Sequence, residues 1–502
     1  MPDQHLSPHT SHLKHPSQPS VQSVASHADA PTPILSDFQR RWLPVVVAIA
    51  LFMQILDATV LNTALPAMAH DLNQPALSMQ WAVISYALTL AIFTPISGFI
   101  ADKYGTRTTF LVAISVFSVG SLMCAISPTL GSLIFARVVQ GLGGALLMPV
   151  ARLTLIKSYP REQMLSVMNY AVMPALVAPV IGPLIGGYLV EWASWHWIFL
   201  INLPMGLLGL WVGLKLMPQY LQRNPSMDLL GFLLFGSSMA CFTFALEFVN
   251  NISADKPQTG VFAAMVAGLA VALLVGYYYH AKHSEARNGQ QPLFGLDLFM
   301  VRTFRVGLLG NLLTRLGMSA IPFLLPLLLQ VVLGYSPSQA GWMLAPIAIG
   351  SLVVKPLVTR IVRRFGYRRT LVINTTVIGL NIMLLSQYNQ HTPLWLSIPL
   401  LTFMGACNSL QFSAMNTISI ARLRPYQTSS GNSLLSANQQ LAISFGIGLG
   451  ASVLHLLTPA RASLVQTQVA FSHAFLLLGV LTILSGLYFL RLHPRDGAGL
   501  YH

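Results

Sequence analysis

Long apolar runs alternate with short polar segments along the chain after about residue 41. A helix needs about 20 apolar residues to cross the hydrocarbon core of a bilayer, so each run predicts one membrane-spanning helix. The pattern predicts fourteen of them, at residues 42–66, 80–101, 107–127, 131–155, 163–190, 196–217, 229–249, 259–280, 303–331, 337–360, 370–388, 393–416, 431–455 and 471–491. The expected fold class is an all-α integral membrane protein.

Composition excludes an ordinary soluble enzyme. Only 8% of the 502 residues are charged and 54% are hydrophobic, whereas soluble domains carry about 25% charged residues. The three cysteines, Cys124, Cys241 and Cys407, lie in separate apolar runs far apart along the chain. We therefore expect neither a disulfide framework nor a metal site.

The basic residues give the orientation of the predicted helices. Of 28 Lys and Arg residues, all but six fall on one side of the membrane when the amino terminus is placed in the cytoplasm. The six others are Lys256 and Arg461 on the opposite side, and Arg137, Arg152, Arg315 and Lys355 within spans. Cytoplasmic loops are enriched in Lys and Arg, so both termini are predicted to be cytoplasmic. The net charge of +14 thus reflects topology, and no nucleic-acid partner is expected.

Residues 1–40 are predicted to form a disordered cytoplasmic tail. They are rich in Ser, Pro and His and nearly free of large apolar residues up to about residue 35. Such a composition does not supply a packed core. The histidines leave metal buffering by this tail as an alternative to plain disorder.

An internal repeat divides the rest of the chain. The sequence Asp-Lys-Tyr-Gly-Thr-Arg at 102–107 parallels Arg-Arg-Phe-Gly-Tyr-Arg at 363–368, eight predicted helices later. Two parallel six-helix halves with two inserted helices explain this offset, and such repeats are typical of transporters. The predicted divisions are a six-helix half at 41–217, the inserted pair with its linker at 218–302, a second half at 303–492 and a tail at 493–502.

Several motifs follow one another in the chain. They are "LDATVLNTALP" at 56–66, Gly98, Asp102, Gly105 and Arg107 in a loop, Arg137-Val-Val-Gln140-Gly141, the helix motif Pro179, Gly182, Pro183, Gly186 and Gly187, and "WHWIFLINLPMG" at 195–206. In this order they resemble the motifs of the major facilitator superfamily, and among its members those of the fourteen-span drug:proton antiporters. Two positions depart from the family pattern. Ala178 stands where a glycine is usual, and Arg363 replaces the acidic residue in the second copy of the loop motif.

The resemblance implies a transporter that works by alternating access and has no cofactor beyond a proton gradient. It implies that Asp102 and its loop motif gate the exchange between inward and outward states. It also implies that the helix motif at 179–187 supports antiport. The small residues of that motif have a physical role of their own, because they allow a second helix to approach closely. The expected partners are a small-molecule substrate, protons and the lipid bilayer, and the protein is expected to be a monomer.

Asp57 is the acidic residue that lies deep within a six-helix half. A charge inside the bilayer is costly and usually functional, and Arg137 is predicted to lie at a similar depth. The pair is interpreted as the proton-coupling site, with Asp57 carrying the proton and Arg137 switching it. A static salt bridge between two helices is the alternative.

Polar residues inside other spans are candidates for a substrate cavity. They are Asn62, Gln140, Asn311, Arg315, Asn408, Gln411, Asn438 and Gln439. Arg315 is predicted to lie close to the midplane of the membrane. Polar side chains also join membrane helices to one another, so part of this set is expected to serve packing alone.

These features predict a proton-coupled exporter of drugs or other amphipathic molecules in the bacterial inner membrane. An exporter of organic acids or their metal chelates is the first alternative, because the spans hold more cationic than acidic residues. A membrane sensor that keeps a transporter fold is a second. The sequence contains no nucleotide-binding loop of the Gly-x-x-x-x-Gly-Lys-Ser/Thr kind, so direct use of ATP is not expected. It also shows no combination of a nucleophile and a base that would predict an enzyme.

Overall fold

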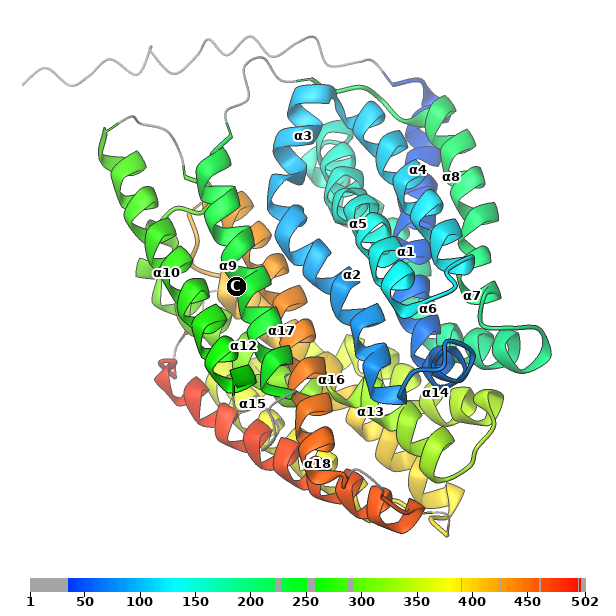
Figure 1. The fold of residues 1–502 in the computed structure, drawn as a ribbon. Helices are drawn as coiled ribbons and strands as arrows, with labels where there is room; N and C mark the ends of the chain where they lie inside the picture. Colours follow the sequence, from blue (N-terminus) through cyan, green and yellow to red (C-terminus); the bar gives the residue numbers. More distant parts are fainter. Residues whose placement is uncertain are drawn as a thin grey trace, which may run out of the picture.

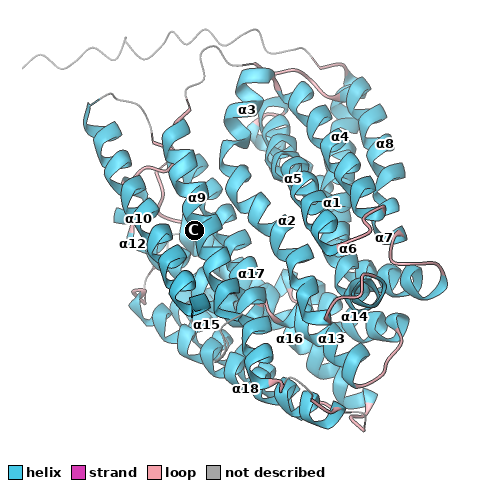
Figure 2. Ribbon diagram, viewed as in Figure 1, coloured by secondary structure: helices cyan, strands magenta, loops and turns pink. Residues whose placement is uncertain are grey.

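The computed structural model describes residues 35–221, 227–250, 258–287, 292–389, 391–424, 427–459, 462–494 and 496–497, and most of the predicted 1–40 tail lies outside them. The described residues form helices joined by short loops, with no strand among them (Figure 2). The helices are α1 (Asp37–Asp71), α2 (Gln80–Phe93), α3 (Ser97–Tyr104), α4 (Thr106–Ala125), α5 (Leu130–Ser158), α6 (Arg161–Trp192), α7 (Trp197–Leu200), α8 (Asn202–Leu216), α9 (Leu229–Asn250), α10 (Gln258–Arg287), α11 (Asp297–Met300), α12 (Arg302–Met318), α13 (Ile321–Leu327), α14 (Pro337–Val353), α15 (Lys355–Leu384), α16 (Leu394–Ile420), α17 (Thr428–Leu457) and α18 (Leu464–Gly486).

Short helical segments extend several of these helices. Four of them, η2 (Ala76–Met79), η3 (Thr94–Ile96), η5 (Leu385–Gln387) and η7 (Leu487–Arg491), are 3-10 turns, and η4 (Leu328–Val332) is a π-helical turn. η2 leads into α2, and η3 joins α2 to α3, so that residues 76–104 form one bent rod. η4 continues α13, where Pro326 removes a backbone donor.

Twelve helical stretches in the described part of the chain are long and apolar enough to cross a membrane. Two long helices, α14 and α16, are not among them. α14 is too short, with 17 residues. α16 has 27 residues, but polar ones such as Asn408 and Gln411 lower its mean hydropathy. The prediction of an all-helical membrane protein is confirmed for the described residues.

The repeated loop motif forms the same backbone turn in both copies. Gly105 separates α3 from α4 with a φ of +91°, and Gly366 bends α15 with a φ of +75°. Side chains other than glycine are strained at such angles, so each glycine permits a reversal that the helices on either side require. The predicted runs at 337–360 and 370–388 lie on either side of the reversal at Gly366, and Val354, between α14 and α15, keeps a right-handed helical backbone.

Two groups of helices pack on each other. In the first group α1 contacts α6, and α5 contacts both α2 and α4; in the second α15 contacts α16 and α18, and α12 contacts α17. The groups meet where α6 lies against α14 and where α2 lies against α17 (Figure 1). Helix α9 packs on α2 and α17 beside this junction, and Trp81 of α2 stacks on Phe244 of α9 at 5.8 Å.

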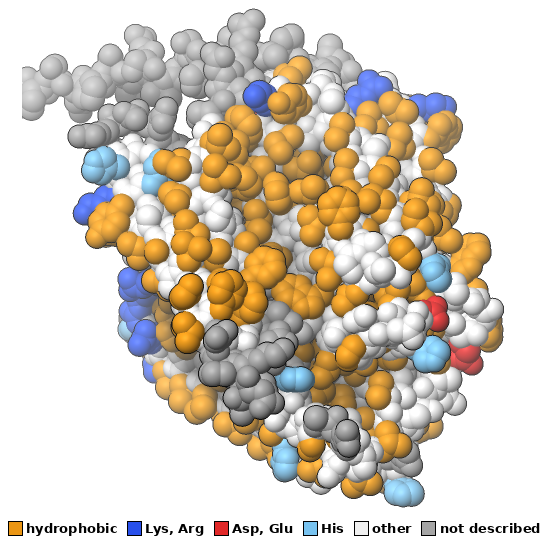
Figure 3. Space-filling view, viewed as in Figure 1, with side chains coloured by type: hydrophobic (Ala, Val, Ile, Leu, Met, Phe, Trp, Pro, Cys, Tyr) orange, Lys and Arg blue, Asp and Glu red, His pale blue; other side chains and the backbone are white. Residues whose placement is uncertain are grey.

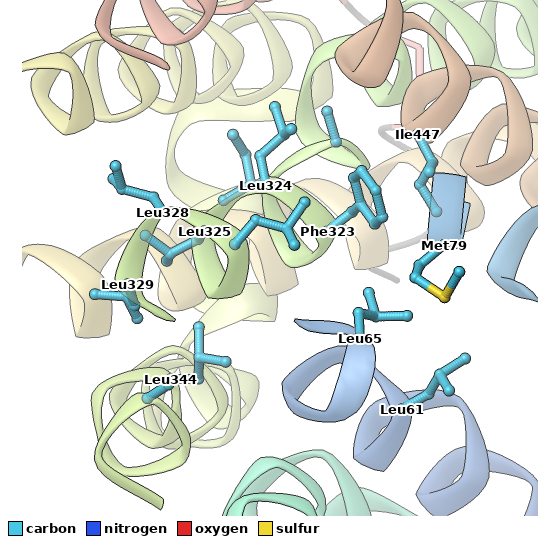
Figure 4. Packing of buried hydrophobic residues seen from close by; sticks show 14 of the residues in the cluster. Leu61, Leu65, Met79, Phe323, Leu324, Leu325, Leu328, Leu329, Leu344 and Ile447 are labelled. Carbon is cyan, nitrogen blue, oxygen red and sulfur yellow. The ribbon is translucent and has the colours of Figure 1, made fainter. Parts of the chain in front are cut away.

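The end of the molecule at which α1 finishes and α14 begins is closed by apolar side chains, and we call it the sealed end. Leu61 and Leu65 of α1 lie close to Phe323 and Leu324 of α13 in one buried cluster (Figure 4). The side chain of Gln330, in η4 directly after α13, donates to the Thr63 carbonyl of α1 at 3.0 Å. Both helix groups therefore contribute to one continuous core at this end.

The other end is called the basic end. It contains the junction of α3 with α4, where Lys103, Arg107 and Lys157 lie. In the face shown by Figure 3, Lys and Arg side chains gather along the top and left edges, while apolar side chains cover most of the surface between. Such a band of exposed apolar residues is expected on the lipid-facing surface of a membrane protein.

Candidate functional site

Asp57 lies inside α1 with its side chain 1% exposed, and it contacts Arg137 of α5. Arg137 Nη1 donates to Asp57 Oδ2 at 2.7 Å, and the Arg137 side chain is also 1% exposed. Gln140 Nε2 and Asn202 Nδ2 both donate to Asp57 Oδ1, at 2.8 and 2.7 Å. The carboxylate thus accepts three hydrogen bonds, an arrangement that suits its ionised form.

Arg137 is held from several sides. Its Nε donates to the Ala82 carbonyl of α2 at 2.9 Å, and its Nη1 also donates to Gln140 Oε1 at 2.7 Å. The guanidinium lies 4.2 Å from the ring centre of Tyr86, close enough for a cation–π interaction. The charge of Arg137 is therefore balanced by one carboxylate, two amide oxygens and an aromatic face.

A second layer is centred on Ser121 of α4. Its hydroxyl accepts from Asn202 at 3.0 Å and from Gln140 at 3.3 Å, and donates to the Phe199 carbonyl at 2.9 Å. We call Asp57, Arg137, Gln140, Asn202 and Ser121 the Asp57 cluster. It joins α1, α4, α5 and α8 through side chains that are all buried.

Glycines bring these helices close enough for the cluster to form. A Cβ on Gly120 of α4 would lie 2.4 Å from the Gln140 backbone nitrogen, and one on Gly143 would lie 2.4 Å from that of Phe117. Real side chains do not fit at such distances, so α4 and α5 touch along their backbones. Close approach of this kind is how small residues support membrane helix packing.

The sequence predicted Asp57, Arg137 and Gln140 but missed Asn202 and Ser121. Contact between Asp57 and Arg137, for which the sequence offered only similar depth, is present. Asn202 follows an apolar stretch in "WHWIFLINLPMG", and its polarity there was the available signal. Asn202 Oδ1 is buried without a hydrogen-bond partner, which costs about 1–3 kcal/mol. A residue chosen for stability alone would avoid that cost.

The charged residues of the loop motif contact two neighbouring helices. Asp102 pairs with Lys157 of α5 at 2.9 Å. Arg107 donates to the Leu214 carbonyl of α8. Asp102 lies in the last turn of α3, from where its carboxylate points toward α5. The spacing of the motif residues along the sequence did not reveal this direction. Gly98 is exposed, with no atom near the position of a Cβ.

The helix motif lies on α6 at the contact with α1 and α14. A Cβ on Gly182 would lie 2.1 Å from Thr59 Oγ1, and one on Gly186 would lie 2.5 Å from the Val60 carbonyl. Gly187 faces the other helix group, with the Pro337 carbonyl at 2.4 Å. The prolines Pro179 and Pro183 fall within α6 as predicted, and the Pro183 carbonyl lies 2.4 Å from the Cβ position of Gly341 in α14. This motif therefore determines how closely both groups approach at the sealed end.

Arg315 lies in α12 with few partners. Its Nε donates to Asn311 Oδ1 at 2.8 Å, and its guanidinium lies 5.0 Å from the ring centre of Phe412 in α16. No carboxylate among the described residues forms an ion pair with it. Asn311 Nδ2 and Asn408 Oδ1 are buried polar atoms without hydrogen-bond partners. Among the predicted cavity residues, Arg315, Asn311 and Asn408 therefore keep the most hydrogen-bonding capacity for a ligand.

The remaining candidates form contacts between helices. Gln411 is fully buried, accepts from Asn374 at 2.8 Å and donates to Thr375 Oγ1 at 2.6 Å. Asn438 donates to the Leu308 carbonyl at 3.0 Å, and Gln439 donates to Asn416 at 2.8 Å. Asn62 is half-buried on α1. Within the described ranges, no group of three or more His, Cys, Asp and Glu residues is placed to hold a metal ion.

Comparison with known proteins identifies the family. The family model described as Major Facilitator Superfamily matches residues 47–295 and 307–500. The chain is 41% identical over 456 residues, 90% of its length and 96% of the relative's, to "Putative multidrug resistance protein MdtD" of Pectobacterium atrosepticum. It is 42% identical to the protein of that name from Escherichia coli strain 55989, over 91% of this chain and 95% of the relative. The resemblance to MdtD thus extends over nearly the whole chain.

Solved structures share the fold. The crystal structure of a D-xylose-proton symporter matches with a TM-score of 0.65 at 14% identity, covering 91% of this chain and 99% of the other. The nucleoside transporter NupG matches with a TM-score of 0.61 at 13% identity, covering 89% and 98%. Identities this low show the fold alone. Together with the family match over most of the chain, they establish that this multi-pass membrane protein belongs to the major facilitator superfamily.

Proposed function

We propose that this protein is a proton-coupled exporter of small molecules, with Asp57 carrying the coupling proton. Its relatives and its fold are those of transporters rather than enzymes. The observation that carries the proposal is the Asp57 cluster, a buried carboxylate that accepts from Arg137, Gln140 and Asn202. An ionisable residue kept inside a membrane at such a cost is functional by default.

Protonation of Asp57 would change the contacts of α1. A neutral carboxyl no longer balances the charge of Arg137, and one of its oxygens turns from acceptor to donor. The side chains of Gln140 and Asn202 would then lose part of their hold on α1. Because α1 packs on Gly182 and Gly186 of α6 and contributes Leu61 and Leu65 to the sealed end, a shift of this helix would reach the contact between the two helix groups.

The proposal includes the topology predicted from the sequence. We infer that α14 and α16 cross the bilayer with the twelve apolar stretches, giving fourteen spans with both termini on the basic side. The positive-inside rule supports a cytoplasmic basic end. The bacterial relatives support the bacterial inner membrane as the location. Their printed name supports drugs or other amphipathic molecules as the substrates.

Transport in everted membrane vesicles tests the role of Asp57. Vesicles containing wild type, Asp57→Asn or Asp71→Asn would be energised and an internal pH dye followed while candidate drugs are added. Asp71 is the matched control, because it lies on the same helix but its side chain is 54% exposed. We expect substrate-dependent proton release for wild type and the control, and none for Asp57→Asn. Unchanged proton coupling in Asp57→Asn would contradict the proposal, and wild-type protein without any flux would favour the sensor.

Arg315 supports a second candidate, the export of anionic metabolites such as organic acids or their metal chelates. Arg315 is a cation within α12 with no carboxylate partner in the described part of the chain. An unpaired guanidinium beside Asn311 offers planar hydrogen bonding to a carboxylate ligand. Arg315→Ala should abolish transport of an anion and leave cation efflux largely intact, and Arg152→Ala, an exposed arginine within a span, is its control. Loss of cation efflux with anion transport retained would remove this candidate.

A further inference from the structure

A basic cavity lies at the turn of α15, away from the Asp57 cluster and Arg315. Its volume is about 590 Å³, and it is formed around Gly366 and the end of the last helix. Three guanidinium groups line it, those of Arg364, Arg368 and Arg369, and no acidic residue does. No ion pair involving these three arginines is present in the described part of the chain. The cavity therefore concentrates positive charge that the protein itself leaves unbalanced.

The remaining walls of the cavity are apolar and exposed. Phe365 is 51% exposed, Ile373 57% and Leu490 46%, and all three line the cavity with Val372 and Pro494. Residues 355–387 contain a segment apolar enough to cross a membrane, and the basic residues of this range all precede residue 370, so Ile373 lies on a helix that enters the bilayer. A soluble anion would use the arginines and gain nothing from these apolar walls.

The corresponding turn in the first half has a different charge pattern. There Asp102 occupies the position of Arg363 and forms an ion pair with Lys157. Lys103, at the position of Arg364, lies over the rings of Phe99 and Tyr104 at 5.6 and 5.4 Å. In the second half Arg363 stands in place of Asp102, and Arg369 stands in place of Thr108. The turn is shared by both halves, but the anion-attracting cavity is a property of the second.

We propose that this cavity binds the phosphate headgroup of an anionic phospholipid, with the acyl chains running along Ile373 and Leu490. Guanidinium groups hold phosphate through paired hydrogen bonds. Basic pockets between membrane helices on the cytoplasmic side recognise anionic lipid headgroups. The lipid would contact both the turn of α15 and the segment that includes η7 and Pro494, because residues of both line the cavity.

Native mass spectrometry of the purified full-length protein tests the proposal. Wild type would be titrated with phosphatidylglycerol and with phosphatidylethanolamine of the same chain length. We expect wild type to prefer phosphatidylglycerol, and the double variant Arg364→Gln/Arg369→Gln to weaken that binding about thirty-fold, since each basic group near the membrane surface contributes roughly fivefold. Arg41→Gln, an exposed arginine at the start of α1, should leave it unchanged.

Two further measurements separate lipid binding from other outcomes. Arg364→Lys/Arg369→Lys keeps the charges and should retain most of the binding, which shows that loss in the glutamine variant is not misfolding. Inorganic phosphate at a large excess should fail to displace the lipid, and Ile373→Gln should weaken lipid binding without affecting phosphate. Equal binding of both lipids, unchanged affinity in Arg364→Gln/Arg369→Gln, or complete displacement by phosphate would overturn the proposal.

Discussion

A double-mutant cycle on Asp57 and Arg137 tests whether the buried pair is energetically coupled. Arg137→Gln would leave the Asp57 carboxylate, 1% exposed, with only the neutral amides of Gln140 and Asn202 as donors. Removing one partner of a buried ion pair costs about 3–5 kcal/mol. Asp57→Asn would leave Arg137 with the Ala82 carbonyl and the Tyr86 ring but no counter-charge, and we expect a loss of about 3 kcal/mol.

The double variant Asp57→Asn/Arg137→Gln should be more stable than the two single losses predict. It contains no unpaired buried charge, and amide side chains can bond to one another across the 2.7 Å contact. We expect a coupling energy of about 2–3 kcal/mol, the upper part of the range for residues in contact. Unfolding by sodium dodecyl sulfate in mixed micelles, followed by circular dichroism, gives the three free energies of unfolding relative to wild type.

The control cycle combines Asp57→Asn with Arg152→Gln. Arg152 lies four turns further along α5 and has an exposed side chain, so these two changes should add to within about 0.5 kcal/mol. If the losses at Asp57 and Arg137 also add to within about 0.5 kcal/mol, the ion pair contributes no interaction of its own. The role of Arg137 as a switch for Asp57 would then have no energetic basis.

Three smaller changes test other parts of the structure. Gly187→Val should separate α6 from the Pro337 carbonyl, now 2.4 Å from the Cβ position, and so make the sealed end more accessible to a maleimide reagent at an introduced cysteine. Gly366→Ala should lower the free energy of unfolding by about 1–2 kcal/mol, because its φ is +75°, as measured by denaturation in detergent. Lys157→Gln should cost at most about 1 kcal/mol in the same assay, because its ion pair with Asp102 is partly exposed.

Matched variants show whether these effects have the stated cause. Gly98→Val and Gly98→Ala are controls for the two glycine changes, since Gly98 is a helical residue with no atom near its Cβ position. Lys157→Arg keeps the charge and should behave as wild type. A maleimide rate that is equal in Gly187→Val and Gly98→Val would show that the α6–α14 contact does not close the sealed end.

Much of the fold could be predicted because the bilayer imposes a simple rule on the sequence. Each apolar run of about 20 residues gives a helix, and Asp57 and Arg137 could be placed at one depth by counting residues from the helix ends. The one-residue break at Val354 could not, because the backbone there stays helical and the chain reverses only at Gly366. The repeat of the turn at Gly105 and Gly366 was visible only because a glycine stands in both copies.

The partners of polar residues were harder to predict than their depth. Gln411 and Arg315 lie in neighbouring helices, yet Gln411 is enclosed by Asn374 and Thr375 whereas Arg315 has Asn311 and Phe412. Which face of a helix meets a neighbour depends on its rotation, and an apolar run surrounded by lipid and protein carries little of the periodicity that would reveal it. Asn202 was missed for the same reason.

The two helix groups differ in how their charges are satisfied, and this difference has a consequence for coupling. In the first group Asp57 pairs with Arg137 and Asp102 pairs with Lys157. In the second, Arg315 has no carboxylate partner in the described part of the chain. If the proton acts on the first group and an anion on the second, neither ligand touches the other's site. Coupling must then pass through the contacts between the groups, chiefly those of α6 with α14, of α2 with α17 and of α1 with α13. Changes at those contacts are therefore expected to alter the ratio of protons to substrate while leaving the affinity of each site intact.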